Sequence, residues 1–142
     1  MARSKRILEA ALCVALFAGC AGAVVAQDVA SAVSARQAAM KAVGAAAGQM
    51  RASGGDPAVL KAAGKTINDN LKVFAANLPA GSGPDSGQTT KAKAEIWSDA
   101  AGFKTAMDAA LTASAALAES GDPAGAQAIG RTCAGCHTGY RS

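Results

Sequence analysis

The sequence predicts an all-α protein, an antiparallel, left-handed four-helix bundle. Apolar and small residues recur at alternating spacings of four and three along four segments, as they do on the inward side of packed helices. Glycine- and proline-containing breaks separate these segments, and no useful stretch alternates with the period of two that a strand requires. The mean repeat of 3.5 residues favours left-handed, nearly parallel crossings, and mostly short connections favour antiparallel neighbours.

The first two helices are expected on either side of a turn at residues 53–55. The first begins near Val29, and its inward stripe consists of Val33, Arg36, Met40, Val43, Ala47 and Met50. Asp56 then supplies an N-cap, and Pro57 occupies the first helical position. The second helix continues the same spacing with the stripe Leu60, Gly64, Ile67, Leu71, Phe74 and Leu78.

A loop is expected at residues 79–87, which contain several helix breakers and no periodicity. The third helix has the stripe Ile96, Ala100, Phe103, Met107, Ala110, Ser114 and Leu117. The sequence Gly121-Asp122-Pro123 ends it and caps the fourth helix. That last helix carries Ile129, Cys133, Cys136 and Tyr140, again at four-three spacing.

The N-terminus is typical of a secretory signal peptide. Three basic residues precede an apolar run at residues 10–18, and small residues follow up to Ala26. We therefore expect residues 1–26 to be removed and residues 27–142 to form one exported, periplasmic domain. The apolar run is too short to span a bilayer, and no other transmembrane segment is expected.

A second interpretation of the N-terminus stays open. The sequence Phe17-Ala18-Gly19-Cys20 resembles a bacterial lipoprotein signal. Cys20 would then be acylated and would tether the protein to a membrane, although one acyl chain anchors only weakly.

Charge and composition exclude some classes of function. The formal net charge is +4, and removing residues 1–26, which hold three basic residues and one acidic residue, leaves +2. No cluster of lysine or arginine marks a nucleic-acid site, so no nucleic-acid partner is expected. The domain is rich in alanine and poor in aromatic residues, and an apolar cofactor would fill the volume that small side chains leave.

The chemistry of the chain is concentrated near its C-terminus. Cys133-Ala134-Gly135-Cys136-His137 fits the attachment pattern of c-type haem, in which two thiols one helical turn apart bind the vinyl groups and the histidine reaches the iron. His137 is the only histidine in the chain. The pattern predicts one covalent haem c on the bundle, with His137 as the iron ligand.

Other roles of a Cys-x-x-Cys pair fit less well. A thioredoxin-like pair would follow a strand, and none is predicted. A structural zinc site takes four ligands, whereas Cys133, Cys136 and His137 are three. A disulfide between the two cysteines is chemically possible but leaves His137 without a role.

Four further residues are candidates near such a haem. Arg36 is the one charged residue on the first stripe, and a buried guanidinium needs an anionic partner such as a haem propionate, unless it snorkels to the end of the bundle. Met40 is either core filler or a group that shields or ligates the iron. Trp97 and Phe103 are either core or haem wall, and both are expected near the haem because aromatic residues are so few.

The chain resembles the class II c-type cytochromes, and most closely the cytochrome c′ family. The resemblance rests on residues 36–41, 95–104 and 133–141, on the spacing between them, and on the C-terminal position of the haem motif. It implies a periplasmic four-helix bundle, usually a homodimer packed through its first two helices. It also implies that Arg36, Gln37 and Glu95 lie near the haem edge and its propionates, and that Arg141 influences the binding of nitric oxide beside His137.

Within this family, the residue at the position of Met40 separates two functions. In cytochrome c′ proper an apolar residue covers an open face of five-coordinate, high-spin iron, which binds nitric oxide or carbon monoxide. In low-spin relatives a methionine there is the sixth ligand, and the protein is an electron carrier. Because some high-spin members also hold an unligated methionine, both interpretations stay open, with the gas-binding protein as the main one.

No dedicated enzyme is expected, since the only histidine is committed to iron and no further acid-base groups surround the motif. A third hypothesis is a haem-free helical interaction module with a disulfide between Cys133 and Cys136.

Overall fold

The computed structural model describes the backbone of residues 20–142 and the side chains from residue 28 on. Its four long helices are α1 (Cys20–Ala52), α2 (Pro57–Ala76), α4 (Ala100–Ser120) and α5 (Pro123–Tyr140). A turn of 3-10 helix, η1 (Pro84–Ser86), and the short helix α3 (Glu95–Ser98) lie in the connection between α2 and α4. No strand occurs in residues 20–142, so the all-α four-helix bundle is confirmed. Residues 1–19 of the expected signal peptide lie outside this part of the chain.

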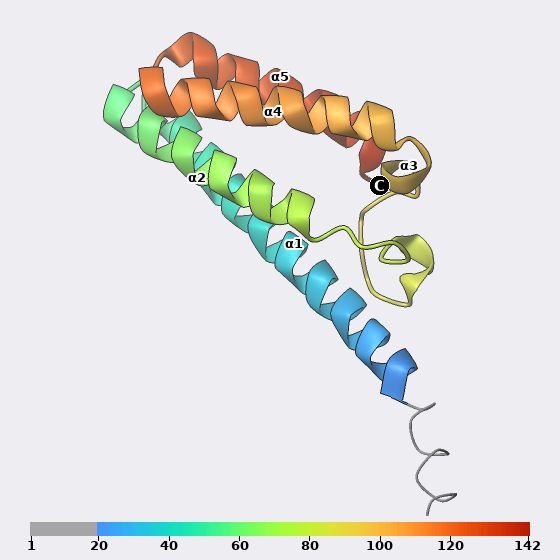
Figure 1. The fold of residues 1–142 in the computed structure, drawn as a ribbon. Coiled ribbons are helices and arrows are strands. Elements are labelled where there is room, and N and C mark those ends of the chain that lie inside the picture. Colours follow the sequence, from blue (N-terminus) through green and yellow to red (C-terminus); the bar gives the residue numbers. More distant parts are fainter. Residues whose placement is uncertain (1–19) are drawn as a thin grey trace, which may run out of the picture.

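The helices pack as two antiparallel pairs. Helices α1 and α2 form one pair, α4 and α5 form the other, and α2 packs against α4 between the pairs. In Figure 1 the pairs meet at the end that holds the α1–α2 and α4–α5 turns, and they diverge toward the end that holds α3 and the C-terminus. In the part of the chain that the structure describes, no helix is long and apolar enough to cross a membrane.

The expected turns and caps are confirmed. Gly54 and Gly55 have φ values of 61° and 91°, and Gly121 has a φ of 66°, all in the left-handed region that glycine adopts without strain. The carboxylate of Asp56 accepts hydrogen bonds from the N–H groups of the first turn of α2, and Asp122 does the same for α5. These local signals fix where the α1–α2 and α4–α5 reversals occur.

Helix α1 differs from expectation at its start and in its buried face. It is already helical at Cys20, ahead of Val29, because the intervening residues are rich in alanine, the best helix former. Its packed face runs through Ala39 and Ala46, which are 3% and 2% exposed, whereas the expected stripe members Met40 and Ala47 are only partly buried. Small alanines let α2 approach closely on one side, and the larger Met40 is left facing a cavity.

The third expected helix is divided in two at Asp99. This residue has φ −117° and ψ 57°, so it ends α3 and at the same time caps α4, where its carboxylate accepts a hydrogen bond from Gly102 N–H at 3.1 Å. Ile96 is buried in α3, and the predicted stripe from Phe103 to Leu117 is buried in α4. Ala100, the expected stripe member next to the break, is exposed.

Gly64 allows the closest approach between α2 and α4. A Cβ at this position would lie 2.6 Å from the backbone nitrogen of Ala118. We expect Gly64→Ala to lower the free energy of unfolding by about 1–3 kcal/mol, because the two backbones must separate. Gly48→Ala in α1 is the matched control: a Cβ there meets nothing within 4 Å, so it should stabilise the helix by about 0.5–1 kcal/mol. Denaturant unfolding of both variants tests this, and equal effects would contradict the close approach.

Candidate functional site

A cavity of about 650 Å³ lies between the inward faces of the helices, with α1 on one side and α5 on the other. Its volume is in the range of small-molecule and cofactor sites, and its walls are mainly apolar. Side chains from all four long helices line it, chiefly Met40, Val43, Ala47, Leu71, Phe74, Phe103, Met107, Ala110, Cys133, Cys136, His137 and Tyr140.

The α5 wall holds the predicted attachment motif. Cys133 and Cys136 lie one helical turn apart, both are half-buried, and both are free thiols that line the cavity. Burial raises the pKa of each thiol, so both are protonated at neutral pH. Partial burial and the nearby charge of Arg141 lower the pKa of His137, which leaves its imidazole neutral, the form that ligates metals. The structure therefore brings all three residues of the motif to one cavity.

The α1 wall faces this motif across the cavity. It consists of Met40, Val43, Gly44 and Ala47, which form an apolar surface on which Met40 offers a thioether sulfur. A soft thioether can ligate iron or simply fill space beside it. Met40 thus lies where both of its predicted roles are possible.

The charged side chains that line the cavity are all basic. Arg36, Arg51, Lys91 and Arg141 contribute to the lining, and no aspartate or glutamate does. An anionic group bound in the cavity would meet only positive charge. Among the described residues, no group of three or more His, Cys, Asp or Glu side chains is placed so that it could hold a metal ion.

Arg36 is buried rather than snorkelling, with 2% of its surface exposed. Its guanidinium donates hydrogen bonds to Ser82 Oγ at 2.8 Å, to the Ser82 carbonyl oxygen at 2.5 Å and to Thr90 Oγ1 at 3.0 Å. It also lies 5.8 Å from the centre of the Trp97 ring. All of these partners are uncharged, and burial lowers the pKa of Arg36. The guanidinium therefore anchors the α2–α3 loop while still lining the cavity.

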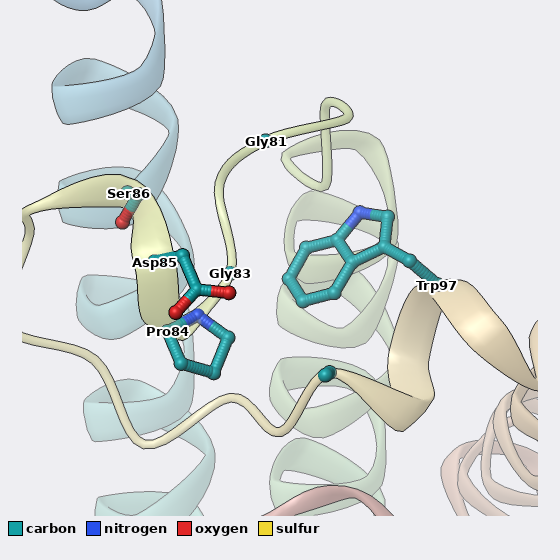
Figure 2. Close-up of a pocket in the computed structure, with 7 residues that line it drawn as sticks. Gly81, Gly83, Pro84, Asp85, Ser86 and Trp97 are labelled. Atoms are coloured by element: carbon teal, nitrogen blue, oxygen red, sulfur yellow. The ribbon is translucent and has the colours of Figure 1, made fainter.

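Trp97, expected to be core or haem wall, packs against the core and is not among the residues that line the large cavity. Its indole lies against Gly83 at a separate pocket of about 240 Å³, beside the turn of Pro84, Asp85 and Ser86 (Figure 2). The indole N–H donates to the carbonyl oxygen of Leu78 at 3.3 Å, because a buried indole needs a hydrogen-bond acceptor. That acceptor and the Arg36 guanidinium, 5.8 Å from the ring centre, hold Trp97 beside the loop.

The remaining predicted residues divide between the cavity and its surroundings. Phe103 lines the cavity, and so do Gln37, which donates to the Thr89 carbonyl oxygen at 2.7 Å, and Arg141. Glu95 does not: it is exposed as the first residue of α3 and is absent from the lining. Glu95 and Trp97 thus lie outside the cavity lining, and their places near a haem stay predictions.

Sequence reasoning missed Phe74 and Tyr140 as site residues. Phe74 packs against Phe103 with ring centroids 6.4 Å apart, and Tyr140 meets Phe103 edge-on at 5.2 Å. Both lie on predicted inward stripes. Their aromatic character, in a chain with so few aromatic residues, is the signal that could have identified them. The three rings form one aromatic side of the cavity.

The phenol of Tyr140 provides a test by pH. Its hydrogen bond to Asp99, partial burial and the charge of Asp99 together raise the pKa of Tyr140 to about 12, above the ordinary value of about 10. Because the pKa is higher in the folded state, the hydrogen bond of the protonated phenol contributes fully to stability below about pH 10. This contribution is lost as pH rises toward 12. Since Tyr140 is the only tyrosine, a tyrosinate absorbance titration reads it alone. Asp99→Asn should lower the titration midpoint toward 10, and an unchanged midpoint would contradict the assignment.

Comparison with known proteins identifies the family. The family model described as Cytochrome C′ matches residues 31–141, which include every residue that lines the cavity. The chain belongs to the cytochrome c′ family. A curated cytochrome c′ of Rubrivivax gelatinosus is 44% identical over 68 residues, a match that covers 43% of this chain and 53% of that protein. The matched region thus spans about half the length of this curated relative.

Solved structures of cytochromes c′ share the fold over most of their length. The crystal structure from Rubrivivax gelatinosus gives a TM-score of 0.70 at 28% identity and covers 80% of this chain and 97% of that one. The cytochrome c′ of Shewanella frigidimarina gives 0.69 at 28% identity, with 80% and 96% covered. A nitric oxide complex of a variant from Alcaligenes xylosoxidans gives 0.64 at 28% identity, with 78% and 94% covered.

Proteins of the cytochrome c′ family carry covalently bound haem c with iron, and the cavity fits this group. Two free thiols face it from one helical turn, a neutral imidazole lies beside them, and the opposite wall is apolar. A lining that holds basic and no acidic side chains suits the two propionates of a haem. The haem supplies an iron centre that can change its redox state or bind a small ligand.

Proposed function

We propose that this cytochrome c′ family member binds nitric oxide or carbon monoxide at a five-coordinate, high-spin haem iron and can also transfer electrons. The observation that carries the proposal is the pairing of two cavity walls: His137 with its two cysteines on α5, and an apolar α1 wall without a strong ligand opposite. The nitric oxide complex among the structural relatives supports gas binding as a property of such a site.

The residues divide the work as follows. Cys133 and Cys136 would hold the haem through thioether bonds, and His137 would be the iron ligand. Phe103, with its two aromatic neighbours, would exclude water from one side of the site. Arg36, Gln37 and Arg141, which line the cavity, would offer hydrogen-bond donors to the propionates.

The cellular setting is part of the proposal. The N-terminal pattern supports removal of residues 1–26 and export to the periplasm, where covalent haem attachment takes place in bacteria. A homodimer through α1 and α2 agrees with the family resemblance and with Val59 and Val73, the exposed large apolar side chains on α2. A lipid tether through Cys20 is the alternative for the N-terminus.

The competing function is that of a low-spin electron carrier in which Met40 is the sixth ligand. The position of Met40 on the wall opposite His137 favours this alternative specifically. Electrons would then be exchanged through the haem edge, and gases would bind weakly.

Absorption spectra of the ferric and ferrous protein, with and without carbon monoxide, separate the two functions. We expect a high-spin spectrum that shifts when the gas is added, and a high-spin state that persists in Met40→Leu. Met50→Leu is the control, because Met50 lies on the same helix but packs into the core away from the cavity. The opposite result is a wild-type spectrum that is low-spin and unchanged by carbon monoxide, and a high-spin spectrum only in Met40→Leu. That result would contradict gas binding and support electron transfer.

A further inference from the structure

Tyr140, the last residue of α5, is fixed from both sides of α3. Its hydroxyl donates a hydrogen bond to Asp99 Oδ2 at 2.7 Å, and its carbonyl oxygen accepts one from Lys93 N–H at 3.0 Å. Lys93 precedes α3 and Asp99 follows it. The end of α5 is therefore tied to two points that flank one short helix.

The acceptor in this contact is itself held in place. Asp99 Oδ1 accepts the N–H of Gly102 at 3.1 Å, and the Asp99 N–H donates to the Glu95 carbonyl oxygen at 2.9 Å. A hydrogen bond from a hydroxyl to an ionised carboxylate is shorter and stronger than one between neutral groups. The Tyr140 hydroxyl thus bonds to an oxygen that is fixed to the first turn of α4.

Gly102 provides the space for this contact. A Cβ at Gly102 would lie 2.6 Å from the Tyr140 hydroxyl and would also collide with the Asp99 carboxylate. The φ of Gly102 is not in the left-handed region, so room for a neighbour is the physical reason for a glycine in the first turn of a helix. Tyr140, Asp99 and Gly102 therefore fit together as one contact between α4 and α5.

The ring of Tyr140 fixes the rotation of the same turn. It meets Phe103 edge-on at 79°, and both rings line the cavity. With the hydroxyl held by Asp99 and the ring held by Phe103, the last turn of α5 cannot rotate about the helix axis without losing one of the two contacts. His137 lies three residues earlier on this helix, and residues at that spacing are neighbours on one face.

We propose that Tyr140 is a positioning residue for His137: its contacts with Asp99 and Phe103 set the direction in which the imidazole enters the cavity. This inference rests on the proposed function, in which His137 is the proximal iron ligand. Loss of the contact leaves the two cysteines free to hold the haem but lets the last turn of α5, and with it the imidazole, change orientation.

The test is the iron–imidazole stretching band in the resonance Raman spectrum of the ferrous holoprotein. Tyr140→Phe removes only the hydroxyl, and Asp99→Asn keeps a side chain that can cap α4 while removing the charge. We expect both variants to shift and broaden the band. Asp56→Asn is the matched control, since Asp56 caps α2 in the same way, through Ala58 and Val59, and its carboxylate makes no hydrogen bond to α5.

The outcomes distinguish this inference from the proposed function. A wild-type band that is unchanged in both Tyr140→Phe and Asp99→Asn overturns the positioning role and leaves His137 as the ligand. If no band of the wild-type spectrum is lost in His137→Ala, His137 is not the iron ligand, and the positioning role is overturned with it. Gly102→Ala is the second approach: it should shift the band by displacing the hydroxyl, and a normal band in a folded Gly102→Ala protein also counts against the inference.

Discussion

Replacing Cys133 and Cys136 together by serine should abolish covalent haem attachment and with it most of the fixed tertiary structure. An empty cavity of about 650 Å³ would cost at most about 16 kcal/mol at roughly 24 cal/mol per Å³, an upper bound because water can enter. Even half of that equals much of the roughly 5–15 kcal/mol that stabilises a typical domain. The helices are held together largely by what fills the space between α1 and α5.

Haem retention after denaturation and near-ultraviolet circular dichroism measure this effect. The matched control is Ala134→Ser, an exposed position in the same turn of α5, which should keep both the haem and the dichroism signal. A colourless double variant with a native signal and a sharp thermal transition would contradict the view that the haem completes the core.

Replacing Arg36 by methionine should destabilise the protein by about 2–3 kcal/mol. The substitution relieves the desolvation of a buried charge, but it leaves the Ser82 carbonyl oxygen, in a residue that is fully buried, without its donor. It also removes the cation that lies over Trp97. All three hydrogen-bond acceptors of Arg36 lie in the loop that it anchors. We therefore expect the loss of these hydrogen bonds to outweigh the gain from no longer burying a charge.

Denaturant unfolding of the holoprotein tests the Arg36 prediction. Gln37→Met is the control, because Gln37 is exposed and makes one hydrogen bond to the same loop, so its loss should cost less than about 1 kcal/mol. An Arg36→Met protein as stable as the wild type would show that the buried charge costs as much as its hydrogen bonds contribute, as happens for some buried ions.

The sequence predicted the parts of the fold that local signals determine. Asp56-Pro57 and Asp122-Pro123 placed two helix starts, and Gly121 placed a helix end. The heptad spacing showed which sides of α2 and α4 are buried. It was ambiguous on α1, where an alanine face and a methionine face lie side by side, since periodicity alone does not tell a packed face from one that borders a cavity.

Contacts that depend on the long α2–α3 connection could not be predicted. Arg36 was expected to meet an anion or to snorkel, and its partners within the protein, Ser82 and Thr90, lie 46 and 54 residues away in the α2–α3 connection. Trp97 lies against the same connection and does not line the cavity. The break at Asp99 had a signal, an N-cap residue within a helical stripe, and recognising it would also have drawn attention to Tyr140.

The most direct test of the account is mass spectrometry of the C-terminal tryptic peptide of the mature protein. Trypsin cuts after Arg131 and Arg141, so residues 132–141 form one peptide that holds both cysteines and the only histidine. The account predicts that this peptide carries the mass of one haem, bound through both sulfurs and stable to denaturation. A peptide with two unmodified thiols, or with a disulfide between Cys133 and Cys136, would contradict it.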